Sequence, residues 1–89
     1  MLKNVDYTTV QRELFEKKRF RLPDWPAGEF IFLVPSSTFS VNREPLLSIL
    51  GEGTIIHYQD HIDRYYGNGV VGTHHVMDHE WMSDAWEEI

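Results

Sequence analysis

Histidine and aspartate residues gather in two short stretches of this 89-residue chain, and metal binding is the first chemistry that they suggest. One stretch runs from His57 to Asp63 and the other from His74 to His79. Imidazole and carboxylate groups are ordinary ligands of zinc and of harder cations. Neither stretch has the spacing of a helical His-Glu-x-x-His site, so a metal-dependent phosphodiesterase is the alternative and not the main prediction.

A second set of side chains suits the binding of a planar anion. The guanidinium of Arg43 is a planar fork that matches the geometry of phosphate. Aromatic rings can stack a nucleobase for about 1–3 kcal/mol each. The candidate rings are Trp25, Phe30, Phe32 and Trp81. Two alternatives stay open, namely a salt bridge from Arg43 to Glu44 or another acidic residue and ordinary core packing of the rings.

Three further residues near these groups also have two interpretations each. Asn42 can bind a ligand or cap the turn that follows it. Thr38 can bind a ligand or satisfy its own turn. Trp25 lies between Asp24 and Pro26 on a stiff loop, where its ring either faces a ligand or closes the end of the sheet.

No stretch of the chain matches nucleophilic or phosphate-loop chemistry. Ser36 and Ser37 lack the Gly-x-Ser-x-Gly elbow of serine hydrolases. Gly67-Asn68-Gly69 is too short for a phosphate loop and leads into a strand. There is no cysteine, so there is no thiol nucleophile and no thiolate metal site. We therefore expect a binding protein without catalytic residues, metal or cofactor.

The stretch Phe30–Pro45, FIFLVPSSTFSVNREP, must position most of the candidate ligand-binding residues. Its five leading apolar residues predict a buried strand that ends before Pro35, because proline has no N–H for the ladder. Residues 36–38 predict a turn, and residues 38–42 predict a second strand. Residues 44–50 predict a helical turn that plugs the core and begins at Pro45.

The remaining segments predict an α+β fold in a single domain, residues 1–89. An N-terminal helix is expected after an N-cap at Thr8 or Thr9. Strands are expected at 19–22, 54–58 and 70–71, with a hairpin turn at 67–69 and a bulge at Gly72. Residues 79–84 predict a short helix, and residues 85–89 an edge strand that carries Trp86 inward. The expected architecture is a short helix on a strongly twisted antiparallel sheet of about five strands.

Composition limits the partners of the chain. The net charge is −6, from 14 acidic and 8 basic residues, which disfavours binding to a long nucleic acid. No apolar run approaches membrane length, and no secretion signal is expected. A chain of this size buries only roughly 60–65% of its unfolded surface, so self-association would add stability.

The central motif resembles a family of small phage and prophage proteins. Phe30 to Pro35, then Ser37-Thr38-Phe39, then Val41-Asn42-Arg43 with Pro45-Leu46, are similar to its F-x-x-P-G-S-T-F-x-V-x-R-x-P-like core. The resemblance extends from about Val10 to Trp86. Part of the family is known as the second family of Thoeris anti-defence proteins. Ser36 replaces a glycine found in many members, and the C-terminal segment also departs from the family pattern.

This resemblance implies a phage sponge that sequesters a cyclic nucleotide-type immune signal without cleaving it. The implied signals are glycocyclic ADP-ribose and, in some members, cyclic dinucleotides; the implied assembly is a homotetramer in the cytoplasm of an infected bacterium. Matching the motif residue by residue adds Phe39, His61 and Asp63 to the site. The predicted ligand-binding residues are Trp25, Phe30, Thr38, Phe39, Asn42, Arg43, His61, Asp63 and Trp81. A direct protein-binding inhibitor of a host enzyme remains an alternative.

Overall fold

The computed structural model describes residues 1–89 and confirms the α+β prediction. The helices are α1 (Tyr7–Leu14), α2 (Leu46–Leu50) and α3 (Asp78–Trp81). The strands are β1 (Phe20–Arg21), β2 (Phe30–Val34), β3 (Ser37–Ser40), β4 (Ile55–Tyr58), β5 (His61–Gly67), β6 (Val70–Thr73) and β7 (Glu87–Glu88). Five strands form an antiparallel sheet in the order β6-β5-β2-β1-β7, while β3 and β4 form a separate pair. None of these three helices could span a membrane.

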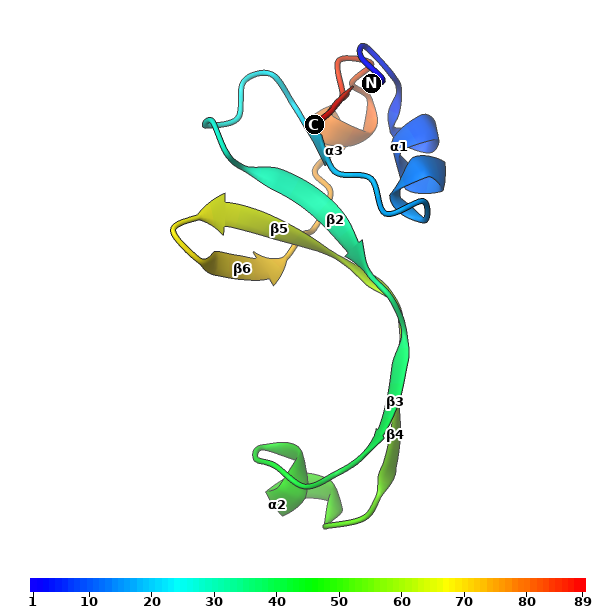
Figure 1. Cartoon of the computed structure of the whole chain (residues 1–89), viewed down its shortest axis with the longest axis vertical. Coiled ribbons are helices and arrows are strands. Elements are labelled where there is room, and N and C mark those ends of the chain that lie inside the picture. Colours follow the sequence, from blue (N-terminus) through cyan, green and yellow to red (C-terminus); the bar gives the residue numbers. More distant parts are fainter.

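The five-stranded sheet and helices α1 and α3 form one end of the molecule, here called the body (Figure 1). Its core is a cluster of fully or nearly fully buried side chains from both ends of the chain. These residues are Tyr7, Val10, Leu14, Phe20, Leu22, Trp25, Ile31 and Trp86. The two termini lie close together, since Val5 and Trp86 exchange two backbone hydrogen bonds. The prediction that Trp86 points inward is therefore confirmed.

Helix α1 begins two or three residues earlier than its sequence pattern predicted. The N-cap is Asp6, whose carboxylate accepts a hydrogen bond of 2.9 Å from the backbone N–H of Thr9. Hydrogen bonding from the side chain of Thr9, together with this backbone bond, lowers the pKa of Asp6 below its usual value. The proposed N-cap residues Thr8 and Thr9 lie within the helix, because a carboxylate three residues earlier already satisfies a free N–H group.

The second part of the molecule is a projecting ribbon, residues 36–60, here called the arm. Strand β2 ends at Val34 as predicted, but the chain does not turn back there. It continues into β3, and the partner strands β4 and β5 continue in the same way. Val34 pairs with His61 before the break and Ser37 pairs with Tyr58 after it, so the register is unchanged. Pro35 thus interrupts one long hairpin without ending it, which corrects the predicted turn at residues 36–38.

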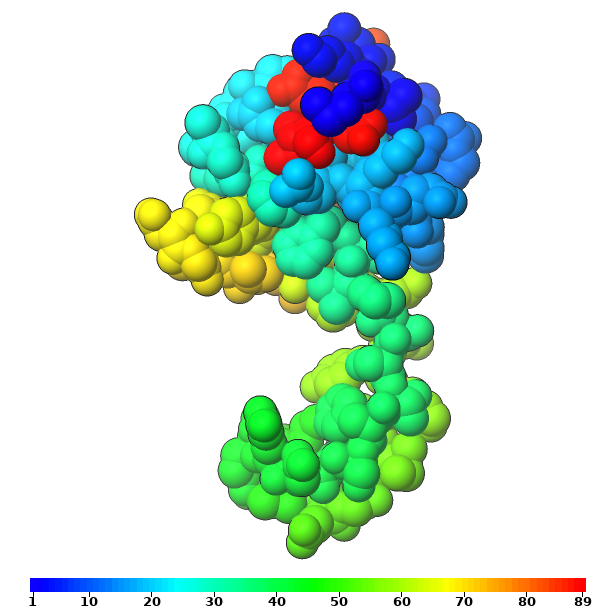
Figure 2. Space-filling model, viewed as in Figure 1, coloured from blue at the N-terminus to red at the C-terminus, as the bar shows by residue number.

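The arm makes the molecule elongated (Figures 1 and 2). The radius of gyration is 15.9 Å, whereas a compact chain of this length would have one of about 12 Å. Helix α2 lies at the tip of the arm and has no buried residue, so the prediction that it plugs the core is wrong. Val41 is the one fully buried side chain of the arm, and its N–H and C=O bond to Thr54 and Gly53. The arm has almost no core of its own.

The hairpin between β5 and β6 turns at Gly67-Asn68-Gly69 as predicted, with all three residues at positive φ. The irregularity in this hairpin lies between Tyr65 and Gly67 and not at Gly72. The predicted bulge is therefore displaced to the strand that enters the turn. Here two glycines already supply the backbone freedom that a bulge needs.

Tyr7 gives a stability prediction, because its hydroxyl is buried and has no hydrogen-bond partner. Burial, with a smaller contribution from the carboxylate of Glu80, raises the pKa of Tyr7 to about 12. The folded state thus favours the neutral phenol, and this contribution to stability is lost as pH rises from 10 towards 12. Tyr7→Phe should shift the onset of alkaline unfolding to higher pH, as followed by circular dichroism. An unchanged onset would contradict this role of Tyr7.

Candidate functional site

The tip of the arm contains a cavity of about 430 Å³ that brings together three of the predicted ligand-binding residues, Phe39, Asn42 and Arg43. Strand β3 contributes Phe39, and the loop that leads to α2 contributes the other two. The remaining lining residues are Glu44, Pro45, Leu46 and Tyr58. A guanidinium, an amide and two aromatic rings therefore meet in one place, as the binding hypothesis requires.

Arg43 and Asn42 are free to bind a ligand. Arg43 belongs to none of the ion pairs of the structure, which are formed by Lys18, Arg21 and Arg64, and takes no part in the histidine–carboxylate contacts of His61 and His74. The neighbouring Glu44 instead accepts hydrogen bonds from the backbone N–H and hydroxyl of Ser48. The side chain of Asn42 does not cap α2, whose N-cap is Pro45. Neither the salt bridge of Arg43 nor the capping by Asn42, which the sequence had left open, is therefore present.

Phe39 and Tyr58 form a stacked pair on the arm. Their ring centroids are 5.4 Å apart and the ring planes differ by 26°. Both rings are partly exposed, so a flat ligand can reach them. Tyr58 was not among the predicted site residues. The pattern of β4 showed a strand, but only the pairing of β3 with β4 reveals that Tyr58 lies beside Phe39.

Three other predicted site residues are held by hydrogen bonds or ion pairs away from this cavity. The hydroxyl of Thr38 lies 3.0 Å from Nδ1 of His57 across the β3–β4 ladder. Nε2 of His61 lies 3.4 Å from Oδ1 of Asp63 on β5. The structure therefore places Thr38 on strand β3 of the arm, and His61 and Asp63 on strand β5, where the arm joins the body.

The last three predicted site residues belong to the body, and one of them is buried. Trp25 is 8% exposed, with the guanidinium carbon of Arg64 only 3.7 Å from the centre of its ring. Its burial favours the interpretation that this ring closes the end of the sheet. Trp81 is 49% exposed and contacts the ring of Tyr7 edge-on. Phe30 is half-buried on β2 and lines a different cavity, described below.

The histidines and carboxylates do not converge into a metal site. No group of three or more of these side chains is close enough to hold a metal ion. In the C-terminal stretch His74 faces Glu80, with Nε2 and Oε1 3.0 Å apart, and both side chains are almost completely buried. The same oxygen accepts the backbone N–H of Met77. This pair joins α3 to the end of β6 and is placed to support the fold.

The His74–Glu80 pair predicts that acid destabilises the fold. Burial lowers the pKa of His74 below 6.5, aided by Arg64 and His75 and opposed by Glu80. The unfolded chain then binds a proton more readily than the folded chain. The free energy of unfolding should fall as pH drops below 6.5. Urea titrations above and below this pH should show a smaller decrease in His74→Gln; an equal decrease in both proteins would contradict the assignment.

Comparisons of the chain with known proteins found no relative. No protein-family model matches the chain, and no curated protein sequence matches it either.

Proposed function

We propose that the protein is a phage anti-defence sponge that binds a cyclic nucleotide-type immune signal and releases it chemically unchanged. The site of action would be the cytoplasm of the infected bacterium, where capture of the signal keeps a Thoeris-type effector inactive. Glycocyclic ADP-ribose is the first candidate signal, and cyclic dinucleotides, which would extend the inhibition to CBASS-type immunity, are the second. The ligand identities come from the resemblance of the central motif.

The observation that carries this proposal is that polar side chains at the arm tip have no partner within the chain. Arg43 and Asn42 make no ion pair or side-chain hydrogen bond, although acidic residues outnumber basic ones in the chain. Beside them, Phe39 and Tyr58 form a stacked and accessible aromatic pair. A guanidinium and an amide next to flat rings would bind the phosphate and the base of a nucleotide together.

The affinity that a sponge needs supports assembly of several copies. Sequestration requires a dissociation constant on the order of nanomolar, about −12 kcal/mol. One arm tip offers two rings and one guanidinium, which contribute about 1–3 kcal/mol for each stacked base and about 1.5–3 kcal/mol for the charged contact. We therefore propose a homo-oligomer, a tetramer by resemblance, in which the site is completed by a second copy.

The surface of the arm supports the same proposal of self-association. A two-stranded ribbon is at best marginally stable by itself in water. The arm also exposes several large apolar side chains, more than a free ribbon would be expected to carry. These residues are Phe39, Ile49, Leu50, Ile55 and Tyr58. A second copy is the partner that is always present where the chain is made.

Calorimetric titration against a small panel of nucleotides tests the proposed function. The panel contains glycocyclic ADP-ribose, a cyclic dinucleotide and linear ADP-ribose. We expect tight binding of at least one cyclic compound and much weaker binding of the linear one. Binding of none of the cyclic compounds by the assembled protein would overturn the proposal.

A direct protein-binding inhibitor is the second candidate, because the exposed apolar arm is also suited to contact a host protein. Affinity purification from host lysate separates the two functions. A stable protein partner without bound nucleotide would favour the inhibitor, provided that the exchange of Ile55 for a charged residue abolished the interaction.

A further inference from the structure

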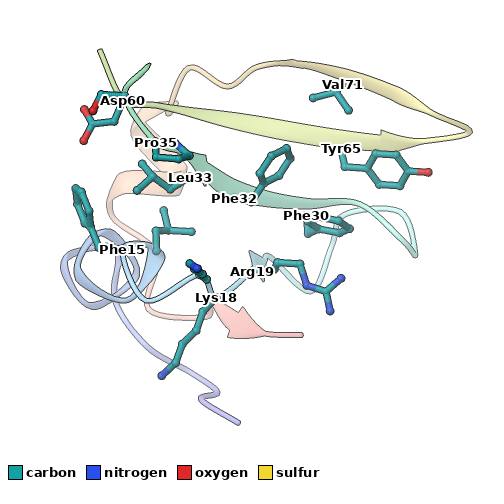
Figure 3. A pocket seen from close by; sticks show the side chains of 13 residues that line it. Phe15, Lys18, Arg19, Phe30, Phe32, Leu33, Pro35, Asp60, Tyr65 and Val71 are labelled. Atoms are coloured by element: carbon teal, nitrogen blue, oxygen red, sulfur yellow. The ribbon is translucent and has the colours of Figure 1, made fainter. Parts of the chain in front are cut away.

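The body contains a second and larger cavity, which the arm-tip site does not use. Its volume is about 800 Å³, within the range of about 300–1,000 Å³ that is usual for small-molecule sites. It lies between the outer face of the sheet and the segment that follows α1 (Figure 3). Phe30 from the predicted ligand-binding residues and the further candidate ring Phe32 both line it.

One wall of this cavity is aromatic and apolar because of the strand register. Phe30 pairs with Tyr65, and Tyr65 pairs with Val71, so their side chains emerge on the same face of the sheet. The core residue Ile31 lies between Phe30 and Phe32 in the chain and points to the opposite face. The rings of Phe30 and Tyr65 are 5.3 Å apart at their centroids. The wall thus offers a partly exposed surface on which a flat ring can stack.

The other wall is positively charged. Lys17, Lys18 and Arg19 follow one another in the chain and all line the cavity. Lys18 is paired with Glu13, but Lys17 and Arg19 take part in no ion pair. The guanidinium carbon of Arg19 lies 5.0 Å from the centre of the Phe30 ring. The single acidic lining residue is Asp60.

From this geometry we infer a second ligand site, in the body, for a planar aromatic compound that carries a phosphate or carboxylate group. The flat part of the ligand stacks on Phe30 and Tyr65, and its anionic group contacts Arg19 and Lys17. The site depends on neither Arg43 nor the arm-tip cavity, so it is independent of the proposed function.

The test uses adenosine 5′-monophosphate and adenosine, which share a flat base and differ in the phosphate. Nuclear magnetic resonance titration of the full chain should show backbone amide shifts at Leu33, Tyr65 and Val71. The nucleotide should bind at least about tenfold more tightly than the nucleoside, because its phosphate makes charge-assisted contacts. Equal affinities, or shifts confined to the arm, would overturn the inference.

Matched variants test whether the charges of Arg19 and Lys17 cause the preference for the nucleotide over the nucleoside. Arg19→Gln and Lys17→Gln should each remove most of the preference for the nucleotide, whereas Lys3→Gln, an exposed change outside the cavity, should leave it intact. Because the preference is read from the amide shifts at Leu33, Tyr65 and Val71, nucleotide binding at the arm tip does not enter the comparison. A loss of preference in Lys3→Gln equal to that in Arg19→Gln would overturn the inference, since general electrostatics would then explain it. The inference would also be overturned if sedimentation showed that the protein is assembled and the assembled protein did not bind the nucleotide.

Discussion

Arg43→Gln is expected to weaken binding of the cyclic signal by about 10- to 150-fold, because one charge-assisted phosphate contact contributes about 1.5–3 kcal/mol. Glutamine keeps much of the length and polarity of the side chain but removes the charge and the fork. Arg43 is exposed and belongs to no ion pair, so the free energy of unfolding should change by no more than about 0.5 kcal/mol. Calorimetry measures the first quantity and urea denaturation the second.

A matched control for this variant is available on helix α1. Arg12 is exposed and lies far along the chain from the arm tip, so Arg12→Gln removes the same charge without touching the cavity. It should bind the signal like the wild-type protein. If Arg43→Gln remains folded and binds as tightly as Arg12→Gln, the arm tip is not the binding site.

Trp25→Ala is expected to destabilise the fold by about 3–5 kcal/mol, the usual cost of truncating a buried tryptophan. The ring is 8% exposed and packs edge-on against Trp86 and His74. It also covers the guanidinium of Arg64, which donates two hydrogen bonds to Glu29. A loss of this size is a large part of the stability of a small domain. Urea denaturation of the purified variant measures it.

Trp81→Ala is the comparison for Trp25→Ala, since Trp81 is 49% exposed. Its edge-on contact with Tyr7 suggests a smaller loss of about 0.5–1.5 kcal/mol. If Trp25→Ala proved as stable as the wild-type protein but failed to bind the signal, the ring would belong to the ligand site after all. That result would require the loop 22–28 to open in solution.

The elements of the fold were largely predictable because they depend on local patterns. The apolar run before Pro35 predicted β2, and Gly67-Asn68-Gly69 predicted the hairpin turn. Both signals act over a few residues, through the missing N–H of proline and the positive φ of the turn. The inward position of Trp86 was also predicted correctly, from its place in the expected terminal strand, residues 85–89.

The course of the arm was not predictable from the same patterns. Residues 36–38 have the composition of a turn, yet Ser37 and Thr38 belong to a strand that pairs with β4. Helix α2 has the leucines of a core element, yet no side chain of it is buried. In both cases the distant pairing of β3 with β4 overrides the local preference. The resulting exposure of apolar residues is itself a reason to expect self-association.

The candidate site was predictable in its residue types and only partly in its arrangement. Asn42 and Arg43 were expected at the end of a strand, and they lie there beside Phe39. Trp25 was ambiguous because its loop allows the ring to face inward or outward, and packing against Arg64 decides the matter. Tyr58 and the cationic wall at Lys17–Arg19 depend on contacts between distant segments, which spacing along one segment cannot reveal.

Recovery of the ligand after capture tests the central claim most directly. Purified protein is mixed with a slight excess of glycocyclic ADP-ribose, separated from free ligand, and heated until it unfolds. We predict that the intact cyclic compound is released, in proportion to the protein, and that a fresh effector assay responds to it in full. Release of linear fragments, with consumption of more than one equivalent of ligand for each site, would contradict sequestration and identify the protein as an enzyme.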